Sequence, residues 1–140
     1  MRGVYLDYAA TTPLDPEVRE AMRAVEEVFG NPSSIHRFGQ EARKVLEEAR
    51  ERVAEALGAR PREVVFTAGG SEADALALLG PALARGRGHV VSTAVEHAAV
   101  LGALRLLERL GFSVTLLKPD SLGMVYPEQV EAALRPDTFL

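Results

Sequence analysis

The residues best suited to chemistry begin with a glycine turn, Ala-Gly-Gly-Ser at 68–71, which lies between an apolar run and a helical pattern. Gly69 and Gly70 let the backbone approach an anion closely, and Ser71 adds a hydroxyl group. The free N–H groups at a helix N-terminus, with the positive end of the helix dipole, suit a phosphate. The segment lacks the Gly-Lys-Ser/Thr ending of a Walker A loop and the pattern Gly-x-Gly-x-x-Gly. It indicates either a phosphate site or a plain strand-to-helix turn with a capping box formed by Ser71 and Asp74.

A histidine follows the next apolar run, residues 89–93, which is predicted to be a strand. Because the carboxyl ends of parallel strands meet at one sheet edge, we expect His97 on the same edge as Ser71. An imidazole there can stack on a planar ligand or move a proton. Taken alone, the position better suits a partly exposed histidine that only starts a helix, and Glu96 suits a helix-start charge.

The remaining candidate groups are few. His36 ends the polar loop Asn-Pro-Ser-Ser-Ile-His at 31–36, where it either reaches a site or is simply solvated, as loop histidines usually are. His89 enters a strand and is a weaker candidate. The three histidines lack the spacing of metal ligands, so no metal site is predicted. The chain has no cysteine, which excludes disulfides, thiolate zinc sites, iron–sulfur ligation and cysteine nucleophiles within it. Its only lysines are Lys44 and Lys118.

The elements that must position these residues follow from hydrophobic periodicity. Residues 4–6 suit a short strand, and Asp15-Pro16 suits the start of a helix that runs to about residue 29. Apolar residues at helical spacing from 42 to 57 predict an amphipathic helix that ends at Gly58. Further on, strands are predicted at 63–67, 89–93, 112–117 and from 137, and helices at 72–79 (ended by Gly80-Pro81), 96–110 and 127–134. This alternation predicts an α/β fold with helices on the faces of a parallel sheet.

Composition excludes several classes of protein. The net charge is −4 and the charges are interleaved, which leaves no basic footprint for nucleic acid and no polybasic patch for a membrane. No apolar run approaches the ~18 residues that span a bilayer, and the N-terminus lacks the apolar core of a signal peptide. We therefore expect a soluble, cytoplasmic protein. Because the chain stops inside an apolar run, we also expect a fragment of a longer protein.

Four segments in register resemble the cysteine desulfurases, a branch of the class V aminotransferase-like enzymes that use pyridoxal 5′-phosphate (PLP). They are residues 5–13, residues 31–36 with Gly39, residues 66–72 and residues 96–100. The resemblance implies part of a three-layer α/β/α large domain of the fold-type I PLP enzymes, with a mostly parallel sheet that is incomplete at the C-terminus. It also implies that residues 1–15 form an arm of the small domain and that residues 16–140 begin the PLP-binding large domain.

The resemblance further implies a role for each site residue. Gly70 and Ser71 would hold the PLP phosphate, and His97 would stack on the pyridine ring and assist proton transfer. The family converts L-cysteine to L-alanine and leaves a persulfide on an enzyme cysteine, which passes sulfur to an iron–sulfur scaffold or a tRNA-thiolation protein. Its members are homodimers and involve no direct contact with nucleic acid or membrane. Ala68 departs from the family pattern, where a serine is frequent.

The lysine that holds the cofactor, the aspartate that pairs with its ring nitrogen and the sulfur-accepting cysteine all lie further along in the family. We therefore expect this chain alone to be inactive. The alternatives are another enzyme of the same fold, such as a selenocysteine lyase, a kynureninase-like enzyme or an aminotransferase, or a non-catalytic phosphate-binding or assembly module.

Overall fold

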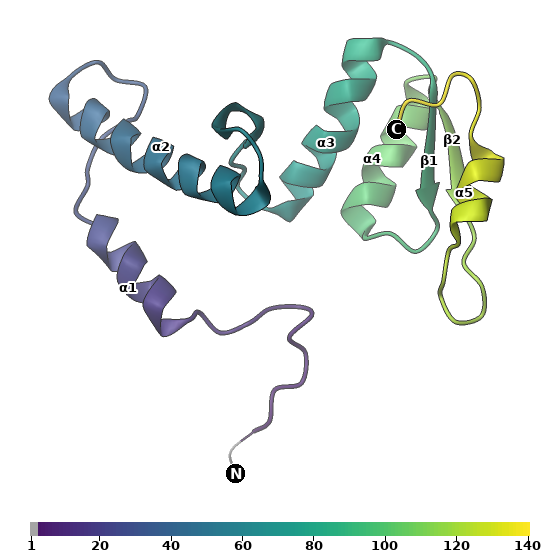
Figure 1. The fold of residues 1–140 in the computed structure, drawn as a ribbon. Helices are drawn as coiled ribbons and strands as arrows, with labels where there is room; N and C mark the ends of the chain where they lie inside the picture. The colour runs from purple at the N-terminus through teal and green to yellow at the C-terminus, as the bar shows by residue number, and fades with distance from the viewer. Residues whose placement is uncertain (1–2) are drawn as a thin grey trace. The chain divides into compact units, whose positions relative to one another are not determined.

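The computed structural model describes residues 3–140 and divides the chain into two compact units, with the boundary between Val65 and Phe66. The first unit holds helices α1 (Pro16–Val25) and α2 (Arg37–Leu57) and the 3-10 helix η1 (Pro61–Glu63), as Figure 1 shows. The second holds α3 (Gly70–Arg85), β1 (His89–Thr93), α4 (Ala98–Arg109), β2 (Ser113–Leu117) and α5 (Pro127–Ala133). The expected domain boundary after residue 15 stays a prediction.

Local capping sets the helix ends of the first unit. α1 begins after Asp15, whose carboxylate accepts a hydrogen bond of 2.8 Å from the backbone N–H of Glu17, and Pro16 occupies its first position. α2 ends at Gly58, which adopts the left-handed conformation with φ 64° and ψ 27°. Both ends confirm the sequence prediction, because each depends on residues that are adjacent in the chain.

Substituting Gly58 with alanine isolates the cost of this conformation. A Cβ atom at Gly58 would meet no heavy atom within 4 Å, so only the backbone strain at positive φ opposes the substitution. We expect Gly58→Ala to destabilise α2 by about 1 kcal/mol. Gly102→Ala, inside α4 and with its nearest neighbour at 3.9 Å, is the matched control and should stabilise slightly. Thermal unfolding followed by far-UV circular dichroism would compare them, and equal effects of the two would contradict the assignment of strain to Gly58.

Two strands that the sequence predicts do not form in the first unit or at its boundary. Residues 4–6 are exposed and irregular. Residues 63–67 contain the end of η1 and then extended backbone without a partner strand, and the carbonyl of Val64 instead accepts from the guanidinium of Arg50. The prediction failed because a strand needs a neighbouring strand, which hydrophobic pattern alone does not supply.

The second unit is built around a parallel pair. β1 pairs with β2 from His89 opposite Ser113 to Thr93 opposite Leu117, and α4 makes the crossover between them. Residues 137–140 lie on the other side of β1: Phe139 N–H donates to the His89 carbonyl at 3.0 Å, and Val91 N–H donates to the Leu140 carbonyl at 2.9 Å. This pairing confirms the strand character predicted for residues 137–140.

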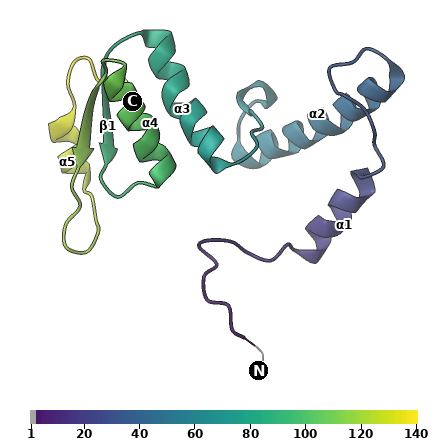
Figure 2. The same ribbon diagram turned by 180° about the vertical axis from the view of Figure 1, so that it is seen from behind.

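Helices cover both faces of this sheet. α3 and α4 lie on one face and α5 lies on the other (Figures 1 and 2). The buried core consists of Ala82 of α3, Val90 of β1, Leu104 and Leu107 of α4, and Phe112 just before β2. The α/β class with a parallel sheet is thus confirmed.

α3 does not end where the sequence predicts. It continues through Gly80-Pro81 to Arg85 and stops at Gly86, which has a positive φ of 84°. Proline inside a helix removes one hydrogen bond and crowds the preceding residue. Gly80 lacks the Cβ that would clash with the proline ring, and Ala82 just beyond is fully buried in the core. Burial of Ala82 therefore outweighs the local signal to stop.

Candidate functional site

The predicted site residues of the second unit gather at one edge of its sheet. The two parallel strands end at Thr93 and Leu117. α3 and α4 both begin at the end of the unit toward which β1 points, in both views (Figures 1 and 2). Since α3 starts with Gly70 and α4 follows His97, the structure brings the glycine turn and this histidine to the same edge.

The start of α3 has exposed donors and no side-chain cap. Its N-cap is Gly69, in extended backbone, and the first intrahelical bond runs from Ala73 N–H to the Gly69 carbonyl at 3.1 Å. The capping box predicted for Ser71 and Asp74 is wrong, because the helix begins two residues earlier than predicted and Ser71 lies within its first turn. The N–H groups of that turn have no intrahelical acceptor, and a Cβ at Gly69 or Gly70 would meet nothing within 4 Å.

This donor set fits an anion that approaches from the open side. Backbone N–H groups, the Ser71 hydroxyl and the positive end of the dipole of a 16-residue helix all favour a phosphate. One charge opposes it: Glu72 lies in the same turn, and its carboxylate accepts from Ala68 N–H at 2.7 Å. That bond and the one from the Thr67 hydroxyl to the Gly69 carbonyl, 3.1 Å, fix the shape of the turn.

His97 is exposed and caps α4. Its Nδ1 accepts a hydrogen bond of 3.2 Å from the backbone N–H of Ala99. Because Nδ1 accepts, we assign the proton of the neutral ring to Nε2, where it remains available to a ligand. Just before it, Glu96 accepts from the Thr93 hydroxyl at 2.8 Å, which ties the loop to the end of β1. The ring is thus oriented by its own helix.

His36, His89 and Lys44 lie elsewhere, whereas Lys118 directly follows the end of β2 at this same edge. His36 belongs to the first unit, where it caps α2 by accepting from Gly39 N–H at 3.3 Å. His89 is fully buried in the sheet. Lys44 pairs with Glu48 on α2 at 3.8 Å, and the Lys118 carbonyl accepts from Gln129. Within residues 3–140 no group of three acidic or histidine side chains is arranged to hold a metal ion, and no helix is long and apolar enough to cross a bilayer.

Sequence reasoning missed two hollows in the second unit. One, of about 330 Å³, lies between the sheet and α5 and is lined mainly by apolar side chains, with Thr93 and Glu96 among its lining residues. The other, of about 850 Å³, lies at the opposite edge of the sheet and is lined by three arginines, Arg85, Arg87 and Arg135. In the sequence, the repeated Arg-Gly at 85–88, just before a predicted strand, was the one local pattern that could have indicated the arginine-lined hollow.

Comparison with known proteins gives consistent matches along the whole chain. The family model described as aminotransferase class-V matches residues 4–140. The cysteine desulfurase IscS of Dictyoglomus turgidum is 52% identical over 143 residues, which covers 99% of this chain and 36% of that protein. The structure titled SspA in complex with cysteine matches with a TM-score of 0.88 and 43% identity, over 96% of this chain and 40% of that one. A NifS-like protein matches with a TM-score of 0.85 and 37% identity, over 97% of this chain and 38% of that one. The chain therefore spans little more than a third of the length of these relatives.

Proposed function

Since the chain belongs to the class-V aminotransferase family, we propose that it forms the part of a cysteine desulfurase that binds the phosphate of PLP and faces its ring. The observation that carries the proposal is the pair of helix starts at one sheet edge. α3 begins there with uncapped donors at Gly70 and Ser71, and α4 begins there after His97. When bound, PLP supplies the electron sink for chemistry at the substrate's α-carbon.

Each residue has a separate part in this proposal. Gly70 and Ser71 donate backbone N–H groups to the phosphate, and the Ser71 hydroxyl adds a further donor. His97 covers the ring and offers its Nε2 proton to the ligand, since Nδ1 is held by Ala99 N–H. The carboxylate of Glu72 is held by Ala68 N–H, which directs it to the turn.

The proposed substrate is L-cysteine, and the proposed products are L-alanine and sulfur bound as a persulfide. The sulfur-accepting cysteine belongs to residues other than these 140, because this sequence has none. The proposed acceptor is an iron–sulfur scaffold or a tRNA-thiolation protein.

A second copy of the enzyme is the proposed partner of the first unit. Four large apolar side chains there are more than three-quarters exposed: Val4, Leu6, Phe29 and Ile35. Apolar surface of this kind is typical of interfaces.

Pyridoxamine 5′-phosphate tests the phosphate site directly, because its amine cannot condense with Lys44 or Lys118. We expect saturable binding to the chain, measured by calorimetry or by amide shifts in NMR spectra. We expect Ser71→Ala to weaken it by about fivefold, since one hydrogen bond to a charged group is lost. Binding of pyridoxamine, which lacks the phosphate, should be weaker still.

Two variants of His97 distinguish its proposed role in covering the cofactor ring from its role as the N-cap of α4. His97→Asn keeps an N-cap acceptor for Ala99 N–H, so it should retain stability and still weaken binding. His97→Ala loses both, with a cost to the helix of about 1 kcal/mol. Ser121→Ala, in an exposed turn, is the matched control and should bind as the parent does. Binding that is unchanged in both Ser71→Ala and His97→Asn would contradict the proposal and favour a non-catalytic module.

A further inference from the structure

The larger hollow of the second unit lies at the edge of the sheet opposite to Ser71 and His97. Gly88 directly precedes β1, and Phe112 and Ser113 lie at the start of β2, so these lining residues mark the amino ends of both strands. Residues 135–137 close the hollow from the other side of β1. It is therefore independent of the proposed PLP site.

The hollow concentrates positive charge in a chain whose net charge is negative. Its lining residues include three guanidinium groups and one carboxylate, whereas the whole chain carries −4. The carboxyl ends of α3 and α4 also face this edge, and each contributes roughly half a negative charge. Even after that offset, about one positive charge remains for a ligand.

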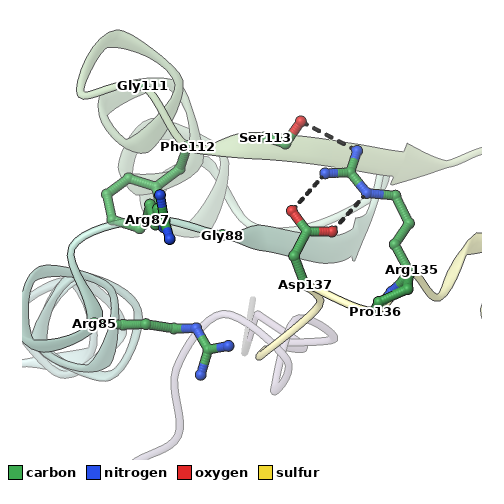
Figure 3. Close-up of a pocket in the computed structure, with 9 residues that line it drawn as sticks. All are labelled: Arg85, Arg87, Gly88, Gly111, Phe112, Ser113, Arg135, Pro136 and Asp137. Carbon is green, nitrogen blue, oxygen red and sulfur yellow. Dashed lines mark hydrogen bonds and ion pairs between the residues drawn. The ribbon is translucent and has the colours of Figure 1, made fainter.

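The guanidinium groups differ in how many of their N–H donors remain available to a ligand. Arg135 uses three of its five N–H donors: it binds both carboxylate oxygens of Asp137, at 2.8 and 3.0 Å, and reaches the Ser113 hydroxyl at 3.2 Å. This pairing lowers the pKa of Asp137, which therefore stays ionised and neutralised by Arg135. The pair forms one wall of the hollow (Figure 3).

Arg85 and Arg87 form the other wall. In Figure 3 neither is joined to another lining residue, whereas the Arg135–Asp137 pair is. Arg85 lies over the ring of Phe139, with its central carbon 5.3 Å from the ring centroid. Stacking uses the face of the guanidinium and leaves its in-plane N–H groups free. Both side chains can therefore offer forked donors of the kind that match phosphate oxygens.

We propose that this hollow, between Arg85 and Arg87 on one wall and the Arg135–Asp137 pair on the other, is a binding site for a phosphate-type oxyanion. Arg85 and Arg87 bind the oxygens, and the Ser113 hydroxyl, whose oxygen accepts from Arg135, donates its own proton. The volume of about 850 Å³ exceeds what a free phosphate needs and accommodates a phosphorylated small molecule.

NMR titration of the 140-residue chain tests this site, with inorganic phosphate and phenyl phosphate as probes at low ionic strength. We expect saturable shifts of the Gly88, Gly111 and Ser113 amides, and tighter binding of phenyl phosphate if the natural ligand is an ester. Arg87→Gln and Arg85→Gln should each weaken binding about tenfold, since each removes charge-assisted hydrogen bonds.

Arg52→Gln, on the exposed face of α2, is the matched control and should leave the affinity unchanged. Unchanged amide shifts along β1 and β2 in each variant would show that the fold is retained. Ser71→Ala should leave this site unaffected, which distinguishes it from the PLP phosphate site in the same spectra. Three results would each overturn the proposal: no saturable shift at these amides, undiminished binding in Arg87→Gln, or equal weakening by Arg52→Gln.

Discussion

Replacing His89 with leucine is expected to lower the free energy of unfolding of the second unit by about 2 kcal/mol or more. His89 is fully buried, and both ring nitrogens are bonded: Nδ1 to the Thr138 hydroxyl at 2.7 Å and Nε2 to the Thr115 hydroxyl at 2.8 Å. One side chain of β1 thus joins β2 to the segment that pairs on the other side. Leucine fills the space but leaves two hydroxyl groups without their partner, which costs more than the hydrogen bonds themselves contribute.

The hydrogen bonds around His89 also assign its tautomer. The Thr138 oxygen accepts from the backbone N–H of Arg135 at 2.8 Å, so its own proton is free to go to His89 Nδ1. The ring proton then resides on Nε2 and is donated to Thr115. The neutral imidazole satisfies every group in this cluster, which explains how a polar side chain occupies the interior of a small sheet.

A pH dependence follows from the same residue. Burial, followed by the positive charge of Arg135, holds the pKa of His89 below its ordinary value of 6.5, and Asp137 offsets part of this. The unfolded chain therefore takes up a proton at higher pH than the folded chain does. The contribution of His89 to stability is complete above about pH 6.5, declines as the pH falls toward the folded-state pKa, and is then constant.

Urea unfolding of the parent and of His89→Leu across pH 5 to 8, followed by circular dichroism, measures both effects. The difference between the two should be largest above pH 7 and shrink in acid. His36→Asn is the control, since it removes an exposed histidine but keeps an acceptor for Gly39 N–H. Thr115→Val in the leucine background should recover part of the loss. A His89→Leu chain as stable as the parent at pH 7.5 would show that the cluster contributes nothing.

Features that depend on neighbours in the sequence were predictable here. The start of α1 at Asp15-Pro16 and the end of α2 at Gly58 follow from caps that act over a few residues. The order β1, α4, β2 follows from the change of hydrophobic period and from the rule that parallel strands need a crossover.

Features that depend on distant residues were not predictable from local pattern. Residues 63–67 have an apolar run but no strand beside them, and α3 continues past Pro81 because Ala82 just beyond it is buried in the core. The His89 cluster brings together side chains 26 and 49 positions away along the chain. No sequence window contains Arg85, Arg87 and Arg135 together, so the positive hollow emerges only from the pairing of strands.

The candidate PLP site has features that the local sequence predicted and one that it did not. The shared edge of the two helix starts followed from the sequence, because strand ends and helix starts alternate in a regular way, whereas the cofactor roles of Gly70, Ser71 and His97 stay a prediction. The N-cap of α3 did not follow from the sequence, since Ser71 and Asp74 fit a capping box as well as they fit positions two residues further into the helix. The observed position of Ser71 supports the proposed function. A serine inside the first turn leaves its hydroxyl available to a ligand, whereas the hydroxyl of an N-cap serine would accept a hydrogen bond from the helix backbone.

The 140-residue chain, supplied with PLP and L-cysteine, is expected to release no L-alanine above the background of free PLP. The sequence has no cysteine to accept sulfur. Its two lysines are unsuited to hold the cofactor covalently: Lys44 pairs with Glu48 on the polar face of α2, and Lys118 is an exposed residue that follows β2. The test measures alanine release over time, with the Dictyoglomus turgidum enzyme as the positive control.

Turnover above background would contradict this expectation, and lysine variants would then locate the amine. Lys118→Arg keeps the charge and removes the nucleophile, as does Lys44→Arg, so loss of turnover in one of them alone would identify the group that binds the cofactor. We expect binding of pyridoxamine 5′-phosphate without turnover. If Ser71→Ala and His97→Asn both weakened that binding, the start of α3 and His97 would recognise the cofactor's phosphate and ring without any covalent step in this chain.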